Sequence, residues 1–131
     1  MNLLLDTHVA LWAIGEPTRL PRTIRALIAD PGNEIFVSAA SLWEIAIKHA
    51  LARGGVGAMP LSAETALAYF SGAGYAILSV SARHAVAVEK LPRLHGDPFD
   101  RLLVAQAFEE PLRLITHDTA VAGYGEAIIA F

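Results

Sequence analysis

Acidic residues are the side chains of this sequence whose types and spacing could do chemistry. The chain has five aspartates, namely Asp6, Asp30, Asp97, Asp100 and Asp118. Asp30 belongs to an Asp-Pro-Gly turn, and the turn accounts for it. Each of the other four lies at or near the end of an apolar run, or opens a helical pattern. These four positions favour a shared acidic site.

Helix capping competes with chemistry as the role of three of these aspartates. Aspartate is a favoured N-cap, worth about 1 kcal/mol relative to alanine. Asp97 precedes Pro98, and proline is enriched at the first helical position, so we expect Asp97 to be mainly a cap. Asp100 then takes the third helical position, where Asp is less expected than Glu, and we assign it to the site. For Asp6 the sequence leaves both roles open.

Glu44 is a fifth candidate, carried by the helical pattern 39–52. It lies at the edge of that helix's polar arc, next to the apolar face. An exposed pair with Lys48 at i+4 would be worth only ~0.3–0.5 kcal/mol. The wall of a cleft fits the same position equally well.

Four of these acids would require a cation if they met. Two carboxylates ~4 Å apart repel each other by about 4 kcal/mol at an effective dielectric constant of 20. Protons or divalent cations must offset that repulsion in a cluster, and oxygen ligands favour Mg²⁺ or Mn²⁺ over zinc. Such cations activate water and stabilise the charge of phosphoryl transfer. The five histidines show no spacing typical of a zinc site, so we expect no histidine ligand.

Apolar runs alternate with helical patterns along the chain, and these elements must position the acids. We predict strands at 3–5, 35–37, 75–80, 112–116 and 128–131. We predict helices at 7–14, 21–29, 39–52, 62–70, 81–91 and 98–109, with a glycine- and proline-containing loop at 54–60. Continuous apolar strands between helices predict an α/β fold, with a mostly parallel sheet of about five strands covered on both faces. Ligands of such folds bind at the carboxyl ends of the strands.

Composition restricts the class of protein. The 131 residues are 54% hydrophobic and 18% charged, which fits one domain spanning 1–131 with a single sizeable core. The absence of cysteine excludes thiol nucleophiles and Cys-ligated metal centres. The uncharged stretch 65–82 is interrupted by Gly72 and Gly74, and no basic residue precedes the apolar start. We therefore expect a soluble, cytoplasmic protein without a membrane span.

The charge balance gives little help with nucleic acids. A net charge of −3 counts against non-specific binding of phosphates. However, Arg19, Arg22 and Arg25 lie close together, and they fit either a solvated helix face or a phosphate-contacting edge. Trp12 and Trp43 could stack on bases, but both lie in apolar helical runs and we expect them in the core.

Four blocks of the sequence resemble the acidic blocks of PIN-domain ribonucleases. They are LLLDTHVALW, SAASLWEIAIK, HGDPFDRLLVAQA and LITHDTAVAGYG. They occur in the order and with the spacing of that family, and the resemblance covers essentially the whole chain. The sequence is most similar to VapC-type toxins of bacterial toxin–antitoxin pairs, which also have this length.

The resemblance implies a fold, an activity and residue roles. The fold would be a PIN-like three-layer α/β/α sandwich. The metal-binding and catalytic acids would be Asp6, Glu44, Asp100 and Asp118, with Asp97 as an outer-sphere ligand and Thr7 and Thr116 as supporting hydroxyls. The activity would be Mg²⁺-dependent endonucleolytic cleavage of RNA, leaving 5′-phosphate and 3′-hydroxyl ends. A homodimer is implied too, as is inhibition by a VapB-like antitoxin in a heterotetramer or larger complex. An inactive PIN-like scaffold that binds RNA or a protein is the alternative, but a scaffold gains nothing from clustered acids.

Overall fold

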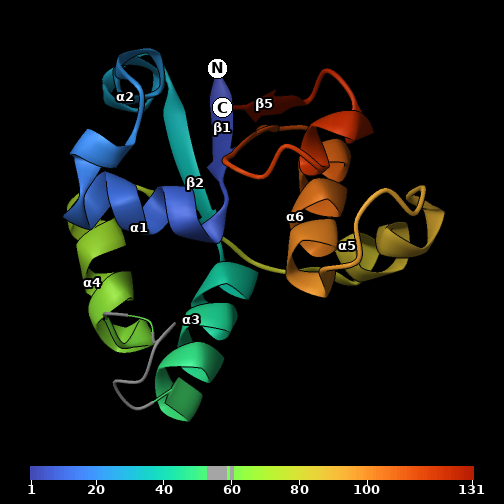
Figure 1. Cartoon of the computed structure of the whole chain (residues 1–131), viewed down its shortest axis with the longest axis horizontal. Helices are drawn as coiled ribbons and strands as arrows, with labels where there is room; N and C mark the ends of the chain where they lie inside the picture. The colour runs from blue at the N-terminus through green and yellow to red at the C-terminus, as the bar shows by residue number, and fades with distance from the viewer. Residues whose placement is uncertain (53–58, 60) are drawn as a thin grey trace.

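The computed structural model describes residues 1–52, 59 and 61–131 (Figure 1). The loop predicted at 54–60 falls, except for Met59, outside the described residues. The strands are β1 (Asn2–Leu5), β2 (Glu34–Ser38), β3 (Ala76–Leu78), β4 (Arg113–Thr116) and β5 (Ile128–Ala130). The α-helices are α1 (Thr7–Gly15), α2 (Arg22–Ala29), α3 (Ala39–Ala52), α4 (Ala63–Gly72), α5 (Ala82–Ala87) and α6 (Pro98–Glu109). Short 3₁₀ helices are η1 (Pro17–Arg19), η2 (Val88–Lys90) and η3 (Val121–Tyr124).

The five strands form one parallel sheet in the order β3-β2-β1-β4-β5. Every neighbouring pair is parallel, and Leu4 of the central strand pairs with Phe36 on one side and Leu114 on the other. Because β1 is covered on both faces, all three of its leucines are buried, and its sequence shows no polar alternation. The predicted α/β fold with a parallel five-stranded sheet is confirmed.

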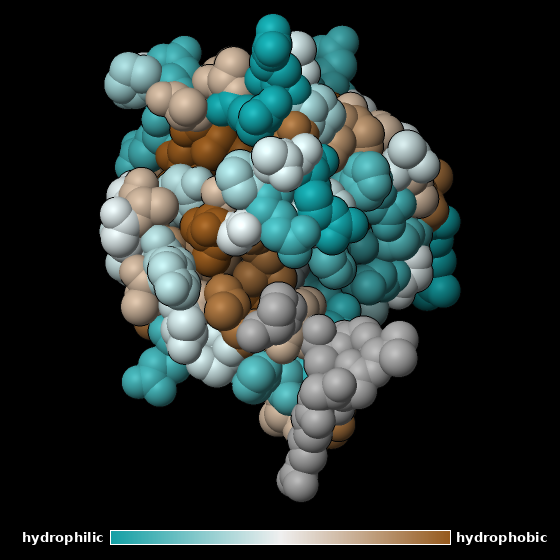
Figure 2. Space-filling model, turned by 60° about the vertical axis from the view of Figure 1, so that its left-hand side comes forward, coloured by the Kyte–Doolittle hydropathy of each residue, from teal (hydrophilic) through white to brown (hydrophobic). Residues whose placement is uncertain are grey.

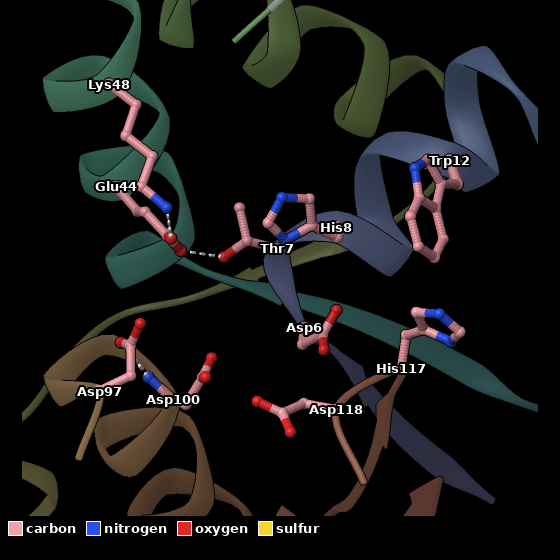
Figure 3. A pocket seen from close by; sticks show the side chains of 10 residues that line it. All are labelled: Asp6, Thr7, His8, Trp12, Glu44, Lys48, Asp97, Asp100, His117 and Asp118. Carbon is pink, nitrogen blue, oxygen red and sulfur yellow. Dashed lines mark hydrogen bonds and ion pairs between the residues drawn. The ribbon is translucent and has the colours of Figure 1, made fainter. Parts of the chain in front are cut away.

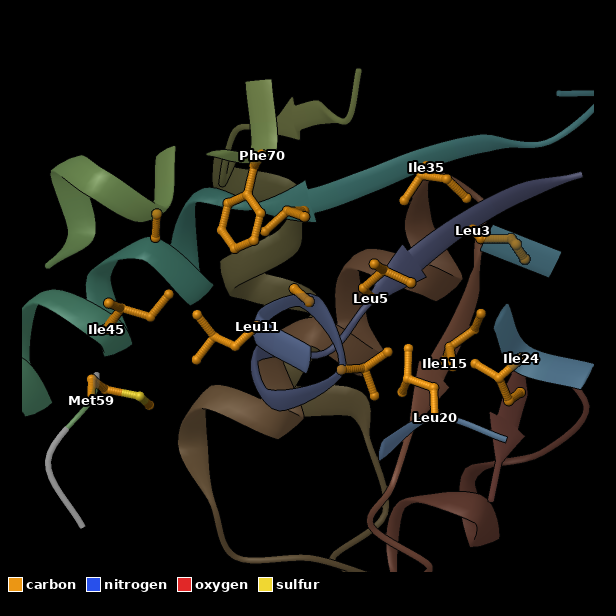
Figure 4. Close-up of a cluster of buried hydrophobic side chains, with 14 residues drawn as sticks. Leu3, Leu5, Leu11, Leu20, Ile24, Ile35, Ile45, Met59, Phe70 and Ile115 are labelled. Carbon is orange, nitrogen blue, oxygen red and sulfur yellow. The ribbon is translucent and has the colours of Figure 1, made fainter. Parts of the chain in front are cut away.

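Alternate residues of β1 belong to two hydrophobic cores, one on each face of the sheet. Leu3 and Leu5 pack into the core beneath α1, α2, α3 and α4, which includes Phe70 (Figure 4). Leu4 packs on the other face with α5 and α6, for example with Leu103. Each fully buried side chain of this kind contributes about 1.5–3 kcal/mol to stability. The helices therefore make three layers with the sheet, and the carboxyl end of β1 is firmly placed.

Three local predictions differ from the structure. The strand predicted at 75–80 is only β3, because it lies at the sheet edge and pairs with β2 alone. The helix predicted at 81–91 divides into α5 and η2. The prediction that Trp43 lies in the core is wrong, since this side chain is 61% exposed. Its helix α3 carries apolar residues around most of its circumference, and the buried side is that of Ile45.

The surface of the described residues adds two observations. Apolar side chains reach the surface on the side of α1 and α4 (Figure 2). A cavity of about 400 Å³ is lined by residues of α1, η1 and α2 and by the segment that follows α4, among them Leu20, Ile28 and Tyr75. Within the described part of the chain, we find no helix long and apolar enough to cross a membrane.

Candidate active site

An acidic cavity of about 390 Å³ opens at the carboxyl ends of β1 and β4 (Figure 3). Its lining residues are Asp6, Thr7, His8, Trp12, Glu44, Lys48, Asp97, Asp100, His117 and Asp118. They come from the loops after β1 and β4, from α1 and α3, and from the start of α6. The four acids predicted from the sequence, together with Asp97, therefore line one cavity. A parallel sheet brings its strand ends to one edge, which explains why residues so far apart in sequence meet there.

Asp6 combines a structural bond with a place in the cavity. Its Oδ1 accepts a hydrogen bond of 2.9 Å from the backbone N–H of Val9, so the capping role is confirmed. Its Oδ2 accepts a 2.5 Å hydrogen bond from the hydroxyl of Thr116, which in turn accepts from the backbone N–H of Asp118. Burial raises the pKa of Asp6, and the bonds from Thr116 and Val9 oppose that rise. Thr116 thereby links the ends of β1 and β4.

Glu44 is buried, with only 5% of the residue exposed, and both its oxygens have partners. Oε1 lies 2.6 Å from the hydroxyl of Thr7, which also contacts Ser41 at 2.9 Å. Oε2 lies 2.6 Å from Nζ of Lys48, so the predicted i+4 pair exists. The pair differs from a solvated one because its acidic partner is buried. A buried carboxylate needs such partners to offset its desolvation.

Asp97 and Asp100 have different local roles, as the sequence predicts. Oδ1 of Asp97 accepts from the backbone N–H groups of Phe99 at 2.8 Å and Asp100 at 3.2 Å, which confirms Asp97 as the N-cap of α6. Asp100 faces the cavity and contacts Nε2 of His95 at 2.8 Å. Burial raises the pKa of Asp100 to about 6; the hydrogen bond with His95 lowers it, and the charges of Asp97 and Asp6 raise it. Burial is therefore the main reason why Asp100 holds its proton more tightly than a free carboxyl does.

His95 is the main residue that sequence reasoning missed. Besides Asp100, its Nε2 approaches Oδ2 of Asp118 at 3.3 Å. His95, Asp97 and Asp100 each offer one ligand atom, and these atoms lie within 4.8 Å of one another. The spacing of the histidines does not reveal His95, because its partners in space are the carboxylates of Asp100 and Asp118 and not another histidine. The available signal was its position two residues before Asp97.

Aromatic rings form one edge of the cavity. Trp12 is half-buried and packs edge-on against His117, with 5.3 Å between the ring centroids, and its centroid lies 6.1 Å from that of His8. The guanidinium of Arg19 lies over the Trp12 ring, 4.5 Å from its centroid. Arg19 is therefore the one of the three predicted arginines that the structure places next to a residue of the cavity. Arg22 and Arg25 are exposed on α2, and neither lines the acidic cavity.

The donor chemistry of this cavity fits a small divalent cation. Its acids offer mainly carboxylate oxygens, which hard cations such as Mg²⁺ and Mn²⁺ prefer. The buried and raised-pKa carboxylates described above also need positive charge to remain ionised together. The cavity is therefore a candidate acidic metal site.

The model of the PIN domain matches residues 3–126 of the chain. The chain belongs to the PIN domain family. Ribonuclease VapC22 of Mycobacterium tuberculosis is 34% identical to it over 117 residues, which are 89% of this chain and 87% of that protein. The resemblance noted in the four acidic blocks of the sequence is thus confirmed, and this PIN domain has a ribonuclease among its relatives.

Solved structures share the fold of this PIN domain. VapBC2 from Rickettsia felis, bound to a DNA fragment from its promoter, matches with a TM-score of 0.68 and 18% identity over 100% of this chain and 98% of that one. DNA-bound VapBC from Salmonella typhimurium matches with a TM-score of 0.66 and 16% identity over 100% of this chain and 97% of that one. At these identities the matches show that the backbone architecture is that of PIN proteins.

Proposed function

We propose that this PIN domain, as a single domain spanning 1–131, is a VapC-like toxin that cleaves RNA with the help of Mg²⁺ or Mn²⁺. The observation that carries the proposal is the meeting of four carboxylates from four separate segments in one cavity. The ribonuclease relative and the family membership support it. The same relationship favours the cytoplasm as its location.

Asp6, Glu44, Asp100 and Asp118 would hold the cation, with Asp97 assisting from the outer sphere. A bound divalent cation would supply the charge that offsets the scissile phosphate and would activate a water molecule. Thr116 keeps Oδ2 of Asp6 fixed, and Thr7 does the same for Oε1 of Glu44. These hydroxyls let the carboxylates keep their positions before substrate arrives, which is the preorganisation that catalysis needs.

The RNA contacts follow from the position of the cavity. The acids lie at the carboxyl end of the sheet. A splayed RNA loop can bring its scissile phosphate there more easily than a duplex can. We therefore propose single-stranded RNA, presented in a structured context, as the substrate. Arg19, with support from Arg22 and Arg25, would contact its phosphates. Sequencing the 5′ ends of cellular RNA cut after induction tests this, and cuts confined to perfect duplex would contradict it.

The partners proposed here are a second copy of the chain and a VapB-like antitoxin. The solved relatives from Rickettsia and Salmonella are VapBC complexes, and this supports a heterotetramer or a larger assembly. A basic antitoxin tail would enter the acidic cavity, where it would meet the carboxylates. Light scattering should give twice the 14.0 kDa mass for the free protein, and a monomer at all concentrations would contradict the dimer.

Cleavage of a mixed RNA pool, measured while Mg²⁺ or Mn²⁺ is titrated, tests the activity. The wild type should cut only with the cation, and Asp6→Asn should not cut. Asp30→Asn is the matched control, because it makes the same change in an exposed turn that Asn also tolerates. RNA binding without cleavage by the wild type at every cation concentration would favour the inactive scaffold instead.

A further inference from the structure

His95 belongs to the acidic cavity by contact, although the residues assigned to the cation so far are all carboxylates. Its Nε2 lies between two of them, 2.8 Å from Oδ2 of Asp100 and 3.3 Å from Oδ2 of Asp118. Asp97 offers a third oxygen, and the ligand atoms of His95, Asp97 and Asp100 lie within 4.8 Å of one another. Atoms from three segments of the chain therefore gather around one point.

The two contacts of this nitrogen also match the spacing of ligands around one cation. Nε2 carries at most one proton, so as a hydrogen-bond donor it reaches both carboxylates only by sharing that proton between them. Two neighbouring ligands of an octahedral cation, each about 2.1 Å from it, are about 3.0 Å apart. The distances from Nε2 to the two carboxylates, 2.8 and 3.3 Å, bracket that spacing.

Arg101 holds the segment that carries His95 in place. Its guanidinium donates hydrogen bonds of 3.1–3.5 Å to five acceptors. They are the carbonyl oxygens of Val88, Leu91, Pro92 and His95 and the hydroxyl of Tyr124. Arg101 adjoins Asp100 on α6, so a single turn of helix presents one acid to the cavity and fixes the loop opposite it. A loop residue with such support can serve as a ligand, because its position is set before binding.

We propose that His95 is a nitrogen ligand of the divalent cation, and that it makes the site prefer Mn²⁺ to Mg²⁺. Imidazole nitrogen suits transition metals, whereas Mg²⁺ selects oxygen ligands. The inference rests on the proposed function only in that a cation binds this cavity. It adds a ligand to the carboxylates and predicts which cation they hold.

Electron spin-echo spectroscopy of the Mn²⁺-loaded full chain, without RNA, tests the proposal. The wild type should show modulation from a directly coordinated ¹⁴N nucleus, and ¹⁵N-labelled histidine should convert it to the ¹⁵N pattern. This arm uses only the wild type, so it does not depend on any variant folding. Bound Mn²⁺ without nitrogen coupling would overturn the histidine ligand and leave the proposed metal site standing. Failure of Mn²⁺ and Mg²⁺ to bind at all would overturn both.

Two variants identify the nitrogen. His95→Gln should abolish the coupling and weaken Mn²⁺ binding about tenfold or more, with a smaller change for Mg²⁺, so the Mn²⁺/Mg²⁺ affinity ratio falls. His8→Gln is the matched control, because His8 also lines the cavity. Among the described residues its ring forms no hydrogen bond or ion pair with an acid of the cavity. This variant should keep the coupling. Tighter Mn²⁺ binding by His95→Gln, or loss of the coupling in His8→Gln alone, would contradict the assignment.

Discussion

At the scale of single residues, several side chains of the cavity cap a helix with one oxygen and also line the cavity. Asp97 illustrates this, since one oxygen caps α6 while the residue lines the cavity. Asp6 likewise caps α1 through Oδ1 and reaches Thr116 through Oδ2. Because capping and chemistry involve the same residue type at the same position, the sequence could not separate them. Substitutions that keep the cap and remove the charge can.

Asp97→Asn and Asp100→Asn should therefore differ. Asn caps helices nearly as well as Asp, so Asp97→Asn should keep its stability within about 0.5 kcal/mol and most of its cleavage activity. Asp100→Asn should fold and lose cleavage, because it removes a charge that has no capping bond. Thermal unfolding and RNA cleavage measured on both variants check this. The opposite pattern would mean that Asp97, and not Asp100, is the third acid of the family's site.

The raised pKa of Asp100 makes a prediction about pH. Because its pKa rises to about 6 on folding, the folded state holds the proton more tightly than the unfolded state does. Without added cation, stability from this group should be present below about pH 4 and lost as pH rises through 6. Asp100→Asn should remove that part of the dependence, so wild type and variant should differ more at pH 7 than at pH 4. Unfolding curves at both pH values measure it, and an equal difference would contradict the raised pKa.

At the scale of elements, the predictable parts are those that the sheet buries on both faces. The runs at 3–5 and 112–116 are strands because central parallel strands are uniformly apolar. The edge strand β3 is shorter than predicted because only one neighbour pairs with it. The sequence wrongly predicts Trp43 in the core, because apolar residues surround most of α3 and do not show which side of the helix is buried. His95 lies in a loop without periodicity, and only contacts across the fold give it a role.

Arg101 joins α6 to the segment 88–95 through its hydrogen bonds, and replacing it should weaken that connection. Arg101→Lys keeps the charge but cannot reach five acceptors with one ammonium group. We expect a loss of about 2 kcal/mol in stability and weaker Mn²⁺ binding. Arg83→Lys is the control, because that arginine forms an exposed pair with Glu109 and should tolerate the change. Unaltered Mn²⁺ affinity in folded Arg101→Lys would argue against a positioning role for this residue.

At the scale of the whole molecule, the charge distribution opposes the substrate unless a cation is present. The chain has a net charge of −3, and its cavity is lined by carboxylates that repel phosphates. If RNA is the substrate, as proposed above, cations in the cavity and basic residues at its rim would have to hold it. Arg19, stacked on Trp12, is a basic residue placed for the second task.

Arg19→Gln should raise the KM for RNA several-fold while kcat changes little, because the loss is in phosphate binding outside the reacting atoms. Arg25→Gln is the matched control on α2 and should have the smaller effect. Steady-state cleavage of one defined RNA at two salt concentrations measures both. If all three of Arg19, Arg22 and Arg25 can be replaced by Gln without a change in KM, the proposed rim of phosphate contacts is wrong.

Binding of a divalent cation by the acidic cavity is the claim on which both the cleavage and the histidine ligand depend. Thermal unfolding of wild type and Asp6→Asn, with and without saturating Mn²⁺, measures it directly. A cation that binds only the folded state stabilises it by about 2.7 kcal/mol at a hundred times its Kd, so the wild-type Tm should rise by several degrees. Asp6→Asn keeps the cap of α1 and should lose most of that rise. An equal rise in both proteins, or none in the wild type, would contradict the account.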